Sequence, residues 1–242
     1  MGGRFDAVER STVTIMGGML EELRSRVERC RAVAAESELP VEIGSPVALP
    51  AAPAEAPTAA VAVFRLFEWV EGPLFRFDCP DELRSAEAWR DLPDLDTLRP
   101  MPIVLGWEMW SWRSTVEGRL GVCGGEQIAL DPVEGDVYYV DDWAWFQRNI
   151  EWEAVADVYH PIAPDAVTFF TEWVFGPRYP ELVSLVLGPG LLEQRIGKGR
   201  HKGELSDAWL RLLQRAELVQ DPLPVIPEDP VPLVSGDRDR PD

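Results

Sequence analysis

Residues 128–140, IALDPVEGDVYYV, constrain the fold of this 242-residue chain more than any other stretch. The apolar run at its start stops at an Asp-Pro pair, a Glu-Gly pair supplies a turn, and its last four residues are β-branched or aromatic. This order predicts a strand, a turn and a second strand. Residues 162–183 predict a capped helix, because Pro164 can occupy a first helical turn and a Gly-Pro pair ends the segment. A hairpin followed by a short capped helix indicates a fold type rather than an active site.

Three stretches of the chain carry a resemblance to a known family. They are an apolar helix that ends in an acidic-Gly turn (VAVFRLFEWVEGP), a Gly-Gly turn that leads into the hairpin (GGEQIALDPVEGDVYYVD), and a closing helix with the pattern IA….FF..W. Over residues 59–183 the sequence resembles the SUKH superfamily, small α+β domains common among bacterial immunity proteins that neutralise polymorphic toxins. It departs from the usual family pattern at residues 141–160. Here the segment between the hairpin and the last helix is longer than in the usual family match, and it is rich in Trp. The resemblance implies a non-catalytic domain that binds a toxin and occludes it.

Acidic residues outnumber basic ones in this chain. The sequence has 42 Asp and Glu against 23 Lys and Arg, which gives a net charge of −19. This charge argues against a nucleic-acid backbone or an anionic membrane as the main partner and fits a basic partner, although it can equally serve only to keep the protein soluble. Apolar residues make up 46% of the chain, which suffices for a substantial core.

The cysteines and the N-terminal residues indicate a compartment. Cys30, Cys79 and Cys123 show neither CxxC spacing nor a disulfide framework. Charged residues interrupt the first ten positions, where a secretory signal would need an apolar run, and no stretch has enough consecutive apolar residues to span a bilayer. We therefore expect a cytoplasmic protein.

Patterning predicts how the chain is organised. The predicted segments are an amphipathic helical segment (1–36), a Pro/Ala-rich linker or surface strap (37–58), the SUKH-like α+β domain (59–187), a basic loop with a C-terminal helix (188–220) and a Pro-rich acidic tail (221–242). Within the domain, glycine turns separate hairpin-length strands, so we expect an antiparallel sheet of about 4–6 strands flanked by helices, with the N-terminal helix and Pro-rich extensions. Apolar residues recur at steps of four and three over residues 14–36, which forms a stripe along a helix. This stripe can pack on the domain, or it can pair with a copy of itself in a self-associating adaptor protein.

Residues that commonly carry catalysis are scarce. The chain has two histidines, His160 and His201. Neither lies at the spacing of a metal-ligand pair from the other histidine or from a cysteine, so we expect no metal and no other cofactor. Residues 188–203 are basic and rich in glycine but lack the spacing of a phosphate-binding loop, and a basic loop that folds back on the acidic domain is the better interpretation. We expect that the protein is not an enzyme. The alternative is an enzyme of unfamiliar type that uses paired carboxylates as general acid and base.

Acidic and aromatic residues concentrate between positions 107 and 153. This interval holds ten acidic residues against three arginines, and six of the ten tryptophans. Aromatic rings supply contact area at low entropic cost and carboxylates steer basic groups, so the mixture suits a surface that binds a basic, nuclease-like toxin domain. Trp107, Trp110 and Trp112, at a spacing of about two, equally fit a half-buried strand. The predicted contact residues are Asp136, Asp141, Asp142, Trp143, Trp145, Glu151, Trp152 and Glu153.

Overall fold

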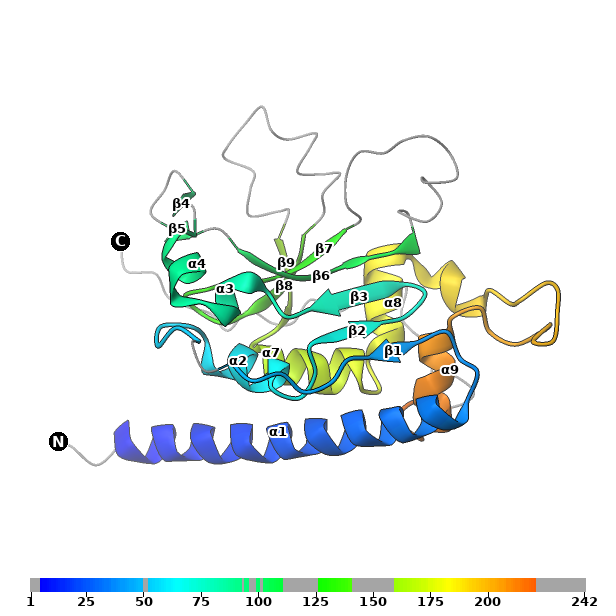
Figure 1. Cartoon of the computed structure of the whole chain (residues 1–242), viewed down its shortest axis with the longest axis horizontal. Coiled ribbons are helices and arrows are strands. Elements are labelled where there is room, and N and C mark those ends of the chain that lie inside the picture. The colour runs from blue at the N-terminus through cyan, green and yellow to red at the C-terminus, as the bar shows by residue number, and fades with distance from the viewer. Residues whose placement is uncertain are drawn as a thin grey trace.

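The computed structural model describes residues 5–49, 52–92, 94–95, 99–100, 102–110, 126–140 and 159–220. Within these ranges, seven antiparallel strands form one sheet in the order β1-β2-β3-β6-β7-β8-β9, and helices pack against it (Figure 1). The strands of this sheet are β1 (Glu42–Ile43), β2 (Trp69–Glu71), β3 (Phe75–Asp78), β6 (Ile103–Glu108), β7 (Gln127–Leu130), β8 (Val137–Val140) and β9 (Tyr159–Ala163). A separate pair consists of β4 (Asp94–Leu95) and β5 (Arg99–Pro100).

In the described part of the chain, the helices range from three to 32 residues in length. They are α1 (Phe5–Glu36), α2 (Thr58–Phe64), α3 (Asp81–Arg84), α4 (Ala86–Arg90), α7 (Ala166–Thr168), the π-helix η2 (Phe169–Val174), α8 (Tyr179–Leu187), the 3-10 helix η3 (Pro189–Glu193) and α9 (Ala208–Arg215). The predicted α+β class is confirmed. The sheet in the described part of the chain has more strands than the predicted 4–6, because both edge strands arise where the local sequence favours other structure.

Each edge strand contains or adjoins residues that are unusual in a sheet. The two-residue strand β1 lies inside the Pro-rich segment and pairs with β2. Strand β9 includes Pro161, which lacks a backbone N–H, and an edge strand tolerates this because one of its sides needs no hydrogen-bond partner. Strand β2 was not predicted either, because the stretch VAVFRLFEWV was predicted as a helix throughout, whereas α2 ends at Phe64 and Trp69–Glu71 form a strand.

The predicted hairpin over residues 128–140 is confirmed and consists of β7 and β8. The side-chain Oδ1 of Asp131 accepts hydrogen bonds from the backbone N–H groups of Val133 (2.7 Å) and Glu134 (2.9 Å). Gly135 follows with φ +83°, a left-handed conformation that glycine adopts without strain, and its N–H donates to the carbonyl of Asp131 (2.9 Å). The motif is therefore a structural turn.

An aromatic cluster joins the sheet to the helices that cover one of its faces. The ring centroid of Phe77 in β3 lies 5.6 Å from that of Phe169 and 5.5 Å from that of Phe170, both in η2. Phe64 of α2 lies 5.6 Å from Phe170, in an edge-to-face arrangement that aromatic pairs favour. The helices α2 and η2 thus form the layer directly on the sheet.

Helix α1 adds a further layer. It begins at Phe5, earlier than the predicted stripe, and runs beneath α2 and α7 (Figure 1). Leu23, Val27 and Cys30 are at most 1% exposed and belong to the same core as the sheet. The stripe therefore packs on the domain at these positions. Burial raises the pKa of the Cys30 thiol to about 12, so this thiol stays protonated at neutral pH.

Residues 37–58 also pack on the domain. Leu39, Leu49 and Ala56 are buried, and the N–H of Gly44 donates to the carbonyl of Trp69 (2.8 Å). A Cβ atom at Gly44 would lie 2.7 Å from the indole of Trp69, so a side chain there would force the two strands apart. This segment contributes an edge strand to the sheet.

Candidate functional site

The sheet has a second face, on the side away from α2 and η2, which we call the outer face. Side chains alternate along a strand, so Phe75 and Phe77 in β3 point into the core while Arg76 and Asp78 lie on the outer face. Trp107 in β6 pairs with Arg76 across the strands. The outer face thus combines charged and aromatic side chains over β3 and β6.

A concavity of about 750 Å³ lies on the outer face, between β3, β6 and α3. We call it the outer concavity. Its apolar lining includes Val104, Trp107 and Met109, and its charged lining consists of Arg76, Asp78, Asp81 and Arg84. Val104 is 37% exposed, which is unusual for an aliphatic residue in a strand of a core sheet.

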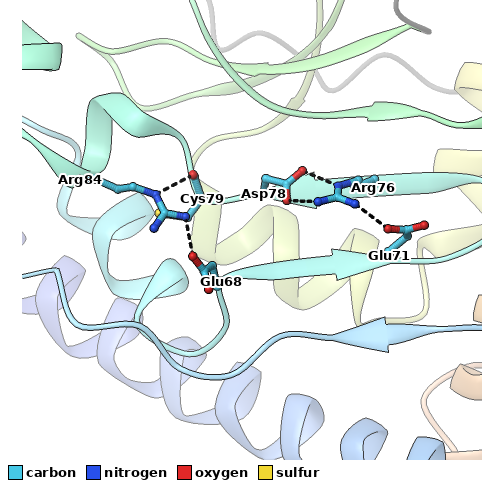
Figure 2. Close-up of polar contacts among 6 residues, drawn as sticks. All are labelled: Glu68, Glu71, Arg76, Asp78, Cys79 and Arg84. Carbon is cyan, nitrogen blue, oxygen red and sulfur yellow. Dashed lines mark hydrogen bonds and ion pairs between the residues drawn. The ribbon is translucent and has the colours of Figure 1, made fainter.

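Arg76 is held by three hydrogen bonds from its guanidinium (Figure 2). Its Nε and Nη2 donate to the two carboxylate oxygens of Asp78 (2.7 and 2.9 Å), and its Nη1 donates to Glu71 (2.7 Å). The sheet creates this arrangement, because Glu71 is the cross-strand neighbour of Arg76 and Asp78 lies two residues along the same strand. The hydrogen bond to Asp78 is the main cause that raises the pKa of Arg76.

Arg84, at the end of α3, forms a second network (Figure 2). It pairs with Glu68 (3.0 Å), donates from Nε to the carbonyl of Cys79 (3.3 Å) and lies 3.7 Å from Asp81. Burial lowers the pKa of Arg84, but the hydrogen bond to Glu68 and the nearby carboxylates outweigh burial and raise it. Both guanidiniums are therefore fixed as cations by carboxylate partners.

The two networks together carry excess negative charge. Two guanidiniums are surrounded by four carboxylates, those of Glu68, Glu71, Asp78 and Asp81. The Asp81 side chain is 93% exposed, whereas both oxygens of Asp78 are engaged by Arg76. Ion pairs this exposed contribute little to folding stability, so their main physical effect is on what the surface attracts.

The neighbourhood of Trp107 depends on a close approach of two strands. A register shift between Val104 and Gly106 interrupts the pairing of β6 with β7. A Cβ atom at Gly106 would overlap the carbonyl oxygen of Arg76, so this position requires glycine. Trp107 is half-buried in β6. The predicted alternation does not extend to Trp110, because β6 ends at Glu108, and Trp110 is 39% exposed.

Of the predicted contact residues, the structure describes one. Asp136 accepts a hydrogen bond from the hydroxyl of Tyr138 (3.2 Å) and lies at the turn end of β8, while the chain leaves the other end of that strand at Val140. The remaining predicted contact residues lie outside the described ranges: Asp141, Asp142, Trp143, Trp145, Glu151, Trp152 and Glu153. Trp112 and Cys123 also lie outside them.

Sequence reasoning missed the charged lining of the outer concavity. A signal was present in the stretch FRFD, where Arg76 and Asp78 alternate with two Phe residues and so share one face of a strand. The partner Glu71 could be identified only from the register of β2 against β3, which the sequence does not state.

The basic, glycine-rich stretch forms a hairpin that extends from the body of the protein next to α9 (Figure 1). The N–H of Ile196 donates to the carbonyl of Glu204, and the N–H of Gly203 donates to the carbonyl of Ile196 (both 2.9 Å). Arg200 pairs with Glu38 (2.5 Å). His201 lies 3.0 Å from Glu204. The other histidine, His160, is exposed and its ring lies 5.5 Å from that of Tyr139, to which it is stacked.

Neither a metal-binding cluster nor a membrane-spanning helix occurs in the described residues. Those residues contain no group of three or more His, Cys, Asp and Glu side chains that could hold a metal ion. Over the same ranges, no helix combines the length and the apolar character needed to cross a bilayer. No family model, no curated protein and no solved structure matches this chain.

Proposed function

We propose that this protein is a non-catalytic binding module that engages a basic protein partner through the outer face of its sheet. The observation that carries the proposal is the outer concavity, where Trp107 and Val104 lie beside charge networks with more carboxylates than guanidiniums. A half-buried aromatic anchor next to surplus negative charge suits a basic protein surface. The net charge of −19 would speed the encounter with such a partner.

The resemblance to SUKH immunity domains supports a more specific role. In this role the protein acts in the bacterial cytoplasm and neutralises a nuclease-like toxin by covering its active surface. The mechanism is steric and electrostatic, and it requires neither a cofactor nor a catalytic residue. A stable complex of this kind buries on the order of 1,600 Å² in total, which is larger than the outer concavity alone.

The proposal includes the Trp-rich residues 141–153, which lie outside the described ranges, as further contacts of the partner. In the sequence they come between β8, which ends at Val140, and β9, which begins at Tyr159, and both strands belong to the same sheet as β3 and β6. In the proposal, Asp141 and Asp142 steer the partner, while Trp143 and Trp152 act as anchors. Asp136, at the opposite end of β8, would lie at the margin of this surface.

The full-length protein can be used as bait in a lysate of its native host. We expect one basic protein to co-purify with the wild type and to be depleted with Asp81→Lys, which changes an exposed side chain, and with Trp107→Ala. A variant with Glu193→Lys and Glu217→Lys, both exposed, is the charge control. Cooperative thermal unfolding of each variant verifies that it is folded.

The captured protein, once identified by mass spectrometry, is then expressed in bacteria with and without this protein. Restored growth on co-expression is the expected result, and Asp81→Lys should reduce it. A partner that binds all variants equally would show that the outer face is not the interface. A partner whose expression is harmless would contradict the neutralising role.

A further inference from the structure

We infer that the outer concavity is an anchor subsite for an arginine side chain of the protein partner, with its guanidinium over the indole of Trp107 and paired with Asp81. This inference rests on the proposed function, because it specifies which partner group occupies the proposed surface. It follows from three properties of the concavity: its shape, its charge, and the Trp107 ring, on which no cation of the described residues is stacked.

The concavity suits a side chain that is long, apolar along its stem and charged at its end. Val104 and Met109 provide an apolar wall, and Asp81 lies on the charged wall. An arginine buries its three methylene groups along apolar surface while its guanidinium remains near polar groups. With about 750 Å³, the concavity is large enough for the whole side chain and for neighbouring backbone of the partner.

The charges favour a cation over an anion. Arg76 directs all three of its hydrogen bonds to Asp78 and Glu71, and Arg84 is paired with Glu68, so an incoming anion would have to displace a carboxylate from one of them. Asp81 is different. Its side chain is 93% exposed and its contact with Arg84 is long, at 3.7 Å, so it can turn to an incoming cation without breaking a short hydrogen bond.

No cation of the described residues stacks on the Trp107 indole. The cation that lies over an aromatic ring in those ranges is Arg178, 3.8 Å from the ring centroid of Trp173 in η2. Trp is the best aromatic partner for a cation, and the planar guanidinium of arginine stacks on it more readily than the compact, strongly hydrated ammonium of lysine. The subsite should therefore prefer arginine to lysine.

The test uses NMR of the full-length protein with ¹⁵N-labelled tryptophan, so that each indole N–H gives one signal. The Trp107 signal is assigned from its absence in Trp107→Phe. The probes are three blocked tripeptides, Gly-X-Gly, in which X is arginine, lysine or citrulline, the neutral isostere of arginine. We expect the arginine peptide to shift the Trp107 signal saturably, the lysine peptide to bind more weakly, and the citrulline peptide to leave the signal in place.

Asp81→Asn should weaken binding of the arginine peptide about two- to fivefold, as expected for one exposed ion pair, and added salt should have a similar effect. The matched control is Asp91→Asn, an exposed acid after α4 that does not line the concavity, and it should leave the affinity unchanged. Trp110→Phe should also leave the response of the Trp107 signal unchanged, because Trp110 does not line the concavity.

The assignment is overturned if the citrulline peptide shifts the Trp107 signal as much as the arginine peptide, or if the arginine peptide shifts other indole signals and leaves this one in place. Failure of the subsite and failure of the proposed function are distinguishable. If Trp107→Ala abolishes binding of a protein partner but no arginine peptide binds, the outer face is the interface and the arginine assignment is wrong. If the arginine peptide binds but no basic protein partner exists, the subsite is correct and the proposed function is wrong.

Discussion

The Nη1 atom of Arg26 donates a hydrogen bond of 2.7 Å to the main-chain carbonyl oxygen of Thr171, 145 residues further along the chain. This bond joins α1 to the π-helix η2. It is possible because Gly176 lies beside both groups: a Cβ atom there would be 2.6 Å from Nη1 of Arg26 and would overlap the Thr171 carbonyl. Helix α1 is therefore attached to the sheet domain by specific polar contacts as well as by its apolar stripe.

Replacing Arg26 with Met is expected to lower the free energy of unfolding by about 1–3 kcal/mol, because the carbonyl of the buried residue Thr171 loses a charged donor. The matched control is Arg24→Met on the same helix. Arg24 pairs with Glu21 at the surface, so its loss should change stability by no more than about 0.5 kcal/mol. Urea denaturation followed by circular dichroism measures both values. Equal effects of the two substitutions would contradict the assigned role of Arg26.

Deleting residues 1–36 is expected to unfold the domain rather than to release a free arm. Leu23, Val27 and Cys30 are buried against the core, and their removal exposes apolar surface of the layer that contains α2 and η2. The deleted protein should lack a cooperative thermal transition. Self-association through this helix is therefore better tested by native mass spectrometry of the full-length protein. A truncated protein that unfolds cooperatively would show that α1 is dispensable for folding.

Gly106→Ala is expected to destabilise the protein by about 1–3 kcal/mol, because the new methyl group would overlap the Arg76 carbonyl where β3 and β6 approach closely. Gly190→Ala is the control, since no atom lies within 4 Å of the position that its Cβ would occupy. Chemical denaturation compares the two variants. A Gly106→Ala protein as stable as the wild type would mean that the strands separate easily at this point.

Asp207 is expected to make stability depend on pH. It caps α9, where its Oδ1 accepts hydrogen bonds from the N–H groups of Trp209 (2.9 Å) and Leu210 (3.2 Å). Burial raises the pKa of its carboxyl from 3.8 to about 6, although Tyr179 and the two backbone bonds lower it. The folded state therefore holds this proton more tightly than the unfolded state, and the contribution of Asp207 to stability falls as pH rises from about 4 to about 6.

Asp207→Asn removes this ionisation but retains an N-cap side chain. Relative to the wild type, the variant should gain stability as pH rises from about 4 to above 6, by up to about 3 kcal/mol at roughly 1.4 kcal/mol per pKa unit. Asp207→Ala should show the same dependence but be less stable by about 1 kcal/mol at every pH, because it also loses the cap. Urea denaturation across this range measures the differences. A difference between Asn and wild type that does not change with pH would refute the raised pKa.

The parts of the fold that could be predicted are those with local signals. The β7–β8 hairpin depends on Asp131 and Gly135, which bond within the turn itself, and the helix stripe depends on spacing along α1. Strand β1 could not be predicted, because its existence depends on hydrogen bonds from residues near Gly44 to a strand more than twenty residues away. Local propensity there favours an extended Pro-rich segment.

The same distinction applies to the candidate site. A strand at Trp107 was predicted, but the spacing of Trp107, Trp110 and Trp112 misplaced its end, because β6 ends at Glu108. The acidic bias of the region followed from composition. The networks of Arg76 and Arg84 depend on the register of β2 against β3 and on where α3 lies, which are set by packing in the core. Most of the predicted contact residues, from Asp141 to Glu153, lie outside the described ranges, so their role in binding stays a prediction.

Charge and aromatic contacts at the Trp-rich segment should affect different rate constants of partner binding. Reversing the charge at both Asp141 and Asp142 is expected to slow association about tenfold at low salt, because these groups attract a basic partner over a distance that salt screening shortens. The double variant Glu193→Lys with Glu217→Lys changes the net charge equally but lies in η3 and after α9, and it should have a smaller effect. Stopped-flow or surface-based kinetics at several salt concentrations measures the association rates.

By contrast, Trp143→Ala or Trp152→Ala should leave association nearly unchanged and speed dissociation about tenfold or more, since a buried aromatic anchor contributes mainly after the two surfaces have met. High salt should remove the difference that the charge reversal causes and preserve the difference that the Trp substitutions cause. If the Trp variants dissociate as slowly as the wild type while Trp107→Ala dissociates quickly, the partner is held by the outer concavity alone. If all of these variants bind with wild-type kinetics, the outer face is not where the partner binds.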